Sequence, residues 1–254
     1  MTKIFQFKNT ILAEFIEICN KNSLWYSLDN YSLLSLVNDL EYWNETDHHE
    51  VFMTFESYEK LKNLYPNKVL DSVKYSDYFS LQNKFVYDIF KINDDCPFIN
   101  INIIIPSSIS RIKKFFKNKN KIKSFSQFYS TINYTNIPKI KNKITLSKFV
   151  KPFLKSINYK DINEYLYDEK YEGFIITSPI INNSFLKKWL TNTDFHLRIF
   201  EKDGMKINVI NEYKNYLKNV YGNKWNEIKN IEIDKRYINV KNIIKYEAFD
   251  EKEN

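Results

Sequence analysis

Glycine and cysteine are both scarce in this 254-residue chain, which contains three Gly and two Cys. Cys19 and Cys96 lie far apart in the sequence. This spacing favours reduced thiols in a protein core over a disulfide framework or a metal knuckle. The chain is rich in Lys, Asn, Ile, Tyr and Phe, a profile typical of an AT-rich genome. Because that bias also erodes glycine motifs, a missing glycine is weak evidence about function here.

Long apolar runs and a secretory signal are also lacking. No segment approaches the roughly 18 to 20 consecutive apolar residues that a bilayer-spanning helix needs. Residues 1–8 lack the charged start and apolar stretch of a signal peptide. We therefore expect no transmembrane segment and a cytoplasmic location. The aromatic sheet consensus and Gly-rich loops of common RNA-binding modules are absent as well.

Composition is otherwise that of a globular protein. Hydrophobic residues make up 43% of the chain, enough for one large domain or a core domain with an appended lobe. The formal net charge is +7 and the pI is about 9.0. This balance permits an anionic partner, such as a nucleotide, a phosphorylated glycan, nucleic acid or a lipid headgroup, without choosing among them.

Hydrophobic periodicity predicts both helices and strands. Helices are expected at residues 10–21, 32–37, 58–65, 109–116, 146–157, 162–167 and 213–221, and strands at residues 24–28, 48–53, 99–105 and 173–177. Gly222 is placed to end the last helix in a left-handed conformation. The order of elements describes an α+β protein whose second half is mainly helical.

Three sequence blocks carry a family resemblance. Residues 25–37 read WYSLDNYSLLSLV, residues 47–60 read DHHEVFMTFESYEK, and residues 200–225 run from FEKDG to YGNKW. In this order they resemble three motifs of the LicD phosphotransferases: Gly-Ser/Thr-Leu-Leu-Gly-Ala-Val-Arg, then Asp-Asp-Asp-Ile-Asp-Ile-x-Met with Asp-Tyr-Glu-Lys, and a closing Tyr-Leu with Tyr-Gly-Asp. The resemblance extends over residues 24–225.

Membership of this family implies a nucleotidyltransferase-like mixed β-sheet core flanked by helices. It also implies transfer of a phosphorylated group, of the phosphocholine or phosphoalditol type, from a nucleotide-diphosphate-activated donor to a glycan acceptor. Magnesium or manganese would bridge the donor phosphates, so a strand must present carboxylates on one face of its pleat. We expect the core in residues 1–107 and a mainly helical lobe, residues 108–254, closing the same cleft, with one continuous domain as the alternative.

Several family positions hold different residues here. The paired carboxylates map onto His48 and Glu50, which we expect to be catalytic and to hold the metal. Asp47 joins them only if the strand is locally distorted. An imidazole with one carboxylate favours softer metals than magnesium. The third acid of the family falls on Ile103, and the nearest polar side chain, Asn102, is the expected substrate contact.

The phosphate-binding turn differs too. The first family glycine maps onto Tyr31, which precedes Ser32 at the start of a predicted helix. Both residues are expected to bind substrate there, because free N–H groups and the helix dipole favour an anion. Arg198 is the expected contact to the donor phosphates.

One segment is strongly basic. Residues 111–123, from Arg111 to Lys123, hold seven cations in thirteen residues. A solvated helix face explains this run, and the alternatives are an anionic glycan, a membrane surface or RNA.

Three functional hypotheses follow. The chain is a LicD-like transferase with an altered metal site, a catalytically impaired relative that binds a nucleotide, glycan or protein, or a basic nucleic-acid-binding protein. Phosphoryl transfer depends on positioning and charge neutralisation, so the altered carboxylates predict weak or absent transferase activity.

Overall fold

The structure is a computed structural model. It describes residues 4–45, 48–75, 78, 81–90, 97–130, 138–179, 181, 183–191, 195–231, 237–240 and 243–246.

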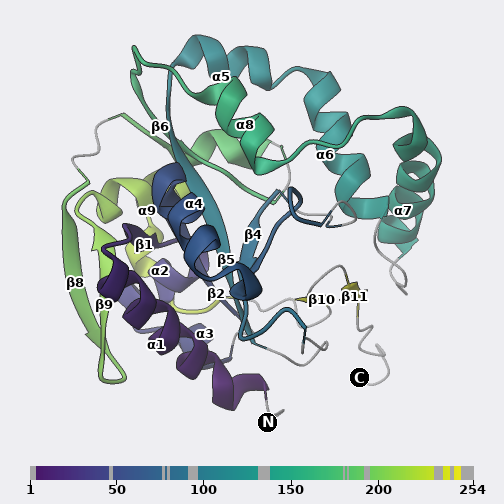
Figure 1. The fold of residues 1–254 in the computed structure, drawn as a ribbon. Helices are drawn as coiled ribbons and strands as arrows, with labels where there is room; N and C mark the ends of the chain where they lie inside the picture. The colour runs from purple at the N-terminus through teal and green to yellow at the C-terminus, as the bar shows by residue number, and fades with distance from the viewer. Residues whose placement is uncertain are drawn as a thin grey trace.

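Helices and strands alternate, and the expected α+β class is confirmed (Figure 1). The α-helices are α1 (Ile4–Asn22), α2 (Asn30–Asn38), α3 (Tyr42–Glu45), α4 (Phe55–Leu64), α5 (Ile109–Phe115), α6 (Asn118–Ser130), α7 (Pro138–Val150), α8 (Tyr159–Leu166) and α9 (Tyr213–Tyr221). The strands are β1 (Tyr26–Leu28), β2 (His48–Thr54), β3 (Val69–Leu70), β4 (Asn83–Phe85), β5 (Phe98–Ser107), β6 (Gly173–Ile176), β7 (Trp189–Leu190), β8 (Leu197–Lys202), β9 (Met205–Ile210), β10 (Tyr237–Val240) and β11 (Ile243–Tyr246). The 3₁₀ helices are η1 (Pro66–Lys68), η2 (Lys151–Phe153), η3 (Asn183–Lys188) and η4 (Trp225–Glu227).

A seven-stranded mixed sheet forms the centre of the molecule. Its main order is β1-β2-β5-β4-β3, with β6 also paired to β5 and β7 paired to β6. Only β2 and β5 run parallel, and the other pairs in this sheet are antiparallel. Strand β5 is long enough to pair with β4 at its beginning and with β6 at its end. The sheet therefore continues past residue 107, where a lobe boundary is expected.

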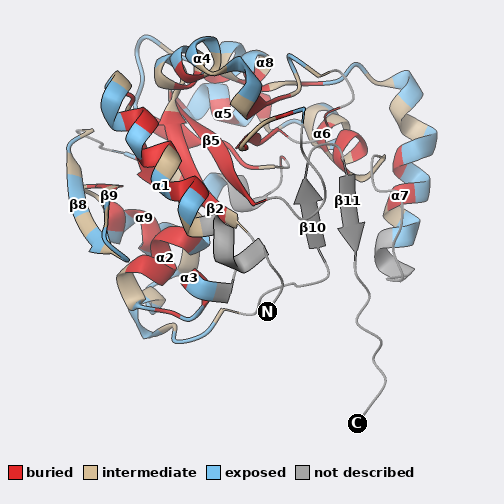
Figure 2. Cartoon of the chain, turned by 60° about the horizontal axis from the view of Figure 1, so that its bottom comes forward, coloured by how far each residue is buried: buried red, intermediate tan, exposed pale blue. Residues whose placement is uncertain are grey.

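Helices cover both faces of the sheet, so most of its side chains are buried (Figure 2). On one face the α1 residue Phe15 packs edge-on against Tyr26 and Phe85, with ring centroids 5.3 Å away in both cases. On the other face, the ring of Tyr216 in α9 packs against the ring of Phe52, with the two ring centroids 6.1 Å apart. We call the first the apolar face and the second the polar face. Figure 1 shows the β8–β9 hairpin beyond edge strand β1.

Local signals account for several helix ends. Helix α4 ends before Pro66, because proline disfavours helical backbone in the preceding residue. Gly222 ends α9 as expected with a positive φ of +90°, but its ψ of −179° is extended and not left-handed helical, a conformation open mainly to glycine. Asp29 and Asn158 cap α2 and α8 by accepting backbone N–H groups.

The second half departs from expectation in two ways. The helix expected at residues 146–157 is displaced, because α7 ends at Val150 and Pro152 lies in a following 3₁₀ turn. Helix α6 and the short strands β7, β8 and β9 are not predicted by periodicity. Strand β7 has only two residues, too few for an alternating pattern, and β8 is largely exposed and buries no clear apolar face.

Two side chains show how the core is built. Cys19 is buried and free, and burial raises the pKa of its thiol, as expected for a core cysteine. Cys96 lies outside the described residues. Trp43 is buried, with its indole N–H 2.8 Å from Asp203 Oδ2. No helix in the described part of the chain combines the length and apolar character needed to cross a bilayer.

Gly173 is required by close packing where β6 meets β7. A Cβ at this position would lie 2.4 Å from the Leu190 carbonyl oxygen and 2.5 Å from Trp189 Cζ2. We expect Gly173→Ala to lower the free energy of unfolding by about 1–3 kcal/mol, because a neighbouring strand must shift. Urea denaturation followed by circular dichroism measures this. A variant as stable as the wild type would show that β7 does not pack against Gly173.

Candidate functional site

Four polar residues lie side by side across the polar face of the sheet. The register pairs Glu50 with Asn100 and Asn100 with Lys84. Asp29 follows β1 directly, and its N–H donates to the Glu50 carbonyl at 2.9 Å. We call these four residues the polar row. All of them are buried, so their charges interact in a medium that screens weakly.

Every Asp29 carboxylate oxygen has donors. Oδ1 accepts from the Asn30 backbone N–H at 2.7 Å and from the Tyr216 hydroxyl. Oδ2 accepts from Asn102 Nδ2 at 2.6 Å and from Lys188 Nζ at 2.8 Å. A carboxylate offers about four lone-pair sites, so Asp29 has little capacity left for another ligand.

Tyrosines surround the two carboxylates of the row. Burial, followed by the negative charge of Asp29, raises the pKa of Tyr216 well above its ordinary value. Burial and then Glu50 raise the pKa of Tyr221, whose hydroxyl donates to Asn30 Oδ1 at 2.7 Å. These phenols therefore remain protonated donors at neutral pH. Asn30 itself has φ +47°, a conformation that asparagine tolerates better than most residues.

Glu50 is the carboxylate with unused capacity. Its backbone N–H donates to Ser32 Oγ at 2.9 Å, which ties strand β2 to helix α2. Its Oε1 lies 3.5 Å from Gln82 Nε2. Within the described residues, Oε2 has no hydrogen-bond partner although Glu50 is only 8% exposed. A buried carboxylate oxygen without a partner indicates a place for a ligand or water.

The other end of the row is cationic. Lys84 Nζ donates to Asn100 Oδ1 at 2.5 Å and lies 3.8 Å from the centroid of the Phe98 ring. The imidazole of His48 stacks on the ring of Phe98, its partner on the neighbouring strand β5, with the ring centroids 5.0 Å apart. Lys188 thus contacts Asp29 at one end of the row, and Lys84 lies at the other end, two strands from Glu50.

The structure brings most of the expected site residues together. His48 and Glu50 share the polar face, as expected for residues two apart in a strand. Ser32 lies beside Glu50, and Asn102 binds Asp29. Tyr31 is partly exposed, and burial and Glu50 raise its pKa.

Tyr31 also belongs to an aromatic group at this edge of the site. Its ring lies 5.6 Å from those of Tyr42 and Tyr221. The position that the family gives to a glycine is therefore filled by a ring packed between two others.

Two of the expected positions lie away from the polar row, and one falls outside the described residues. Ile103 is not at the site, because it alternates with Asn102 and points to the apolar face. Arg198 is exposed on β8, where its guanidinium Nε donates to Asn211 Oδ1 at 2.6 Å. None of its contacts in the described part of the chain is with the polar row. Asp47 is outside the described residues.

Sequence reasoning overlooked Asp29, Lys84 and Lys188. Asp29 had a signal, since it stands between an apolar strand and a helix start, where a cap is expected. Lys84 and Lys188 had none, because both lie among many other lysines.

The site fits a divalent metal poorly. Among the described residues, no group of three or more His, Cys, Asp or Glu side chains is arranged to hold a metal ion. Asp29 is filled by four donors, which leaves Glu50 and the neighbouring His48 as two ligands. Octahedral magnesium prefers several oxygen ligands, so two mixed ligands make a weak site.

Comparisons of the chain with protein-family models, with curated proteins and with solved structures gave no match.

Proposed function

We propose that this protein binds a phosphorylated ligand of the nucleotide-diphosphate type, as a catalytically impaired LicD-like protein with a nucleotidyltransferase-like fold. The observation that carries the proposal is the Asp29–Lys188 pair on the polar face of the sheet. A nucleotide-activated donor and a glycan acceptor are the partners proposed for this site. Any anionic partner of the basic run from Arg111 to Lys123 would bind a different surface from that of Asp29 and Lys188.

The charges of the site balance without a metal. A transferase that uses magnesium needs carboxylates whose oxygens are open to the ion, because the ion then neutralises the phosphates. Here the carboxylate of Asp29 is paired with the ammonium group of Lys188, and Lys84 adds a second positive charge on the same face of the sheet as Glu50. Lys188 thus supplies the positive charge beside Asp29 that a metal ion would otherwise supply.

The open groups of the site are acceptors. Glu50 Oε2 and Asn102 Oδ1 are buried and have no hydrogen-bond partner in the described residues. Acceptors of this kind require donors such as sugar hydroxyls or the exocyclic amine of a base. A nucleotide or an activated sugar carries these donors together with phosphates that the two lysines attract.

A second candidate, the active LicD-like transferase, is favoured by one observation. Glu50 Oε2 is open, and His48 lies on the same strand and face. These two side chains could hold one magnesium or manganese ion with weak affinity. The ion would then polarise donor phosphates during transfer to a glycan hydroxyl.

Calorimetric titration separates the two candidates. The probes are CDP-choline and UDP-glucose, each added with EDTA or with manganese. We expect binding that does not need metal and no measurable turnover. Glu50→Gln should weaken binding by about tenfold or more, because a hydrogen bond to a charged group is lost. Glu56→Gln, at an exposed position on α4, is the matched control and should bind as the wild type does.

The alternative outcomes are distinct. Binding that appears only with manganese, together with donor hydrolysis, would favour the transferase. No binding of either probe under any condition would contradict both candidates.

A further inference from the structure

Charge is distributed very unevenly along the chain. Residues 97–160 contain fourteen Lys or Arg and no Asp or Glu. The rest of the chain holds 24 basic and 31 acidic residues, so it is acidic overall. The basic segment includes β5 and helices α5, α6 and α7, and α6 and α7 lie together at one side of the molecule (Figure 1). The positive charge of the protein is therefore concentrated in residues 97–160, which we call the basic lobe.

Half of the fourteen cations of this lobe are exposed and form no ion pair with another described residue. Arg111 pairs with Asp168 at 3.4 Å and Lys160 with Glu59 at 2.8 Å. Within the described residues, seven exposed lysines of the lobe form no ion pair: Lys113, Lys114, Lys117, Lys119, Lys141, Lys148 and Lys155. Such a surface attracts anions over about one Debye length.

Large apolar side chains are exposed between these lysines. Leu146, Phe149 and Phe153 are 58%, 74% and 79% exposed. Their spacing of three and four residues places them along one line of α7 and the following turn. The Phe149 and Phe153 rings are 6.4 Å apart. This line is separate from the buried side of α7, which carries Ile144 and Ser147.

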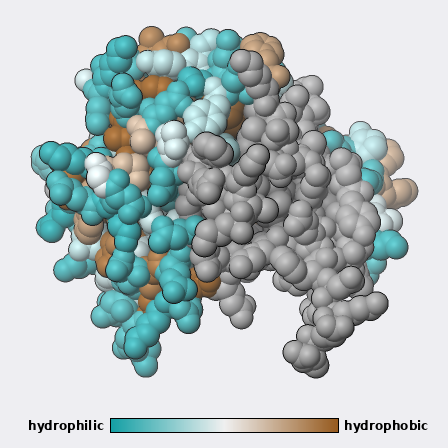
Figure 3. Space-filling model, turned by 90° about the horizontal axis from the view of Figure 1, so that it is seen from below, coloured by the Kyte–Doolittle hydropathy of each residue, from teal (hydrophilic) through white to brown (hydrophobic). Residues whose placement is uncertain are grey.

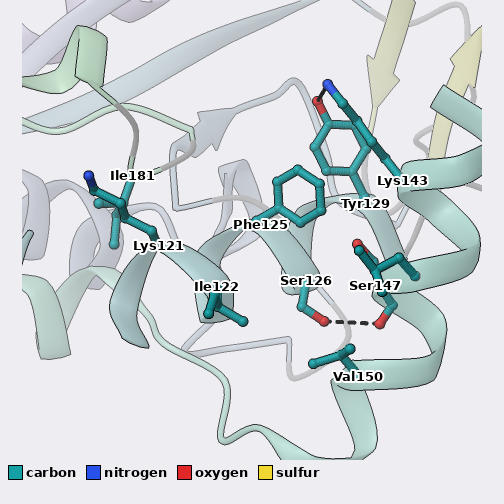
Figure 4. Close-up of a pocket in the computed structure, with 10 residues that line it drawn as sticks. Lys121, Ile122, Phe125, Ser126, Tyr129, Lys143, Ser147, Val150 and Ile181 are labelled. Carbon is teal, nitrogen blue, oxygen red and sulfur yellow. Dashed lines mark hydrogen bonds between the residues drawn. The ribbon is translucent and has the colours of Figure 1, made fainter. Parts of the chain in front are cut away.

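An apolar groove adjoins the line. It has a volume of about 840 Å³ and lies between α6 and α7 (Figure 4). Phe125, Val150 and Leu146 are among its lining residues. Lys143 stands at one side with its Nζ 5.1 Å from the centroid of the Tyr129 ring. Seen from below, hydrophobic side chains reach the surface at the α7 edge of the molecule (Figure 3). The groove thus extends the exposed apolar surface.

We propose that the α6–α7 face binds the surface of a lipid bilayer that contains anionic lipids. Lysine ammonium groups would contact lipid phosphates and carboxylates, while Leu146, Phe149 and Phe153 enter the boundary between headgroups and acyl chains. Lipid fits better than a nucleic acid, because a phosphate backbone would leave Leu146 and the groove in water. This surface does not depend on the function proposed for the polar row.

Vesicle flotation tests the proposal with the full chain. The probes are vesicles of phosphatidylcholine alone and of phosphatidylcholine with phosphatidylserine. We expect binding only with phosphatidylserine, weakened but not abolished by high salt, since the apolar part is not screened. The double variant Phe149→Ser/Phe153→Ser should lower the partition constant by about tenfold or more. The double variant Lys141→Glu/Lys148→Glu should lower it similarly.

Matched controls change the same residue types elsewhere. Ile199→Ser removes an exposed apolar side chain from β8, and Lys214→Glu/Lys218→Glu reverses two exposed charges on α9. Both should bind vesicles as the wild type does. The proposal would be overturned if the control variants lost vesicle binding to the same extent, or if the wild type bound both vesicle types equally. It would also be overturned if the wild type bound single-stranded RNA but not vesicles. All substituted residues are exposed, so circular dichroism is expected to show unchanged folding.

Discussion

Replacing Lys188 by methionine is expected to lower the free energy of unfolding by about 3–5 kcal/mol. The substitution keeps most of the volume of the side chain but removes the ammonium group that lies 2.8 Å from Asp29 Oδ2. Asp29 is fully buried, so removing the ammonium group leaves its carboxylate without a compensating charge. Asn102 and Tyr216 still donate to it, but neutral donors do not replace a charge. Urea denaturation measures the loss.

Two further variants show whether the pair itself is responsible. Lys187→Met changes the preceding, exposed lysine, and its effect should stay within about 0.5 kcal/mol. The double variant Asp29→Asn/Lys188→Met removes both charges and should be more stable than the sum of the single effects predicts, by about 1–3 kcal/mol. If Lys188→Met were as mild as Lys187→Met, the buried ion pair would not exist in solution.

Asn102→Asp is expected to have the second large effect. The side chains have the same shape, but Asn102 Nδ2 now donates to Asp29 Oδ2 at 2.6 Å. A carboxylate in that place would face Asp29 directly, and one lysine cannot balance both charges. We expect a loss of about 3 kcal/mol or more without metal, because an uncompensated charge is buried. Thermal denaturation in EDTA measures it.

The same variant should gain a response to metal. It would bring a third carboxylate beside Asp29 and Glu50, which is the oxygen-rich arrangement that magnesium and manganese prefer. At a metal concentration a hundredfold above the dissociation constant, binding would restore about 2.7 kcal/mol. The wild type should show a much smaller change.

Asn100→Asp is the matched control on the same strand and face. Asn100 Oδ1 already accepts from Lys84 Nζ, so a carboxylate there gains an ion pair instead of a repulsion. We expect this variant to lose less stability than Asn102→Asp and to respond less to metal, because Lys84 offsets part of the repulsion between the new carboxylate and the neighbouring Glu50. If both variants lose stability equally, burial of any added charge, and not the contact with Asp29, explains the effect.

Together these variants bear on why the site is proposed to bind without catalysing transfer. The position that would supply a third acid on the polar face is Asn102, and the position that would free Asp29 for a metal is Lys188. Both residues hold Asp29 in a network that closes without an ion. A variant that both folds and binds metal would show how few substitutions separate a site without metal from a metal-binding site.

Much of the fold could be predicted from sequence, because it depends on local patterns. Helical spacing of apolar residues marks α1, α4, α5 and α9, and proline and glycine mark two of their ends. The alternation of Ile with Asn100 and Asn102 marks a buried strand with one polar face. Strand periodicity also placed His48 and Glu50 on the same face, since side chains two apart in a strand must point the same way.

The composition of the site was decided by tertiary structure. Lys188 reaches Asp29 from 159 positions away, and Tyr216 from 187. No local pattern distinguishes these residues from the many other lysines and tyrosines of the chain. The sequence also leaves open whether Ile103 or Asn102 faces the site, because a register error of one residue exchanges the two faces of a strand. The sequence by itself determined the helices α1, α4, α5 and α9 and the strands β2 and β5, and that residues 97–160 carry only positive charges. Which charges meet, and which stay exposed, depended on long-range packing, because Coulomb energies in a buried site are set by distances between atoms that the chain brings together only on folding.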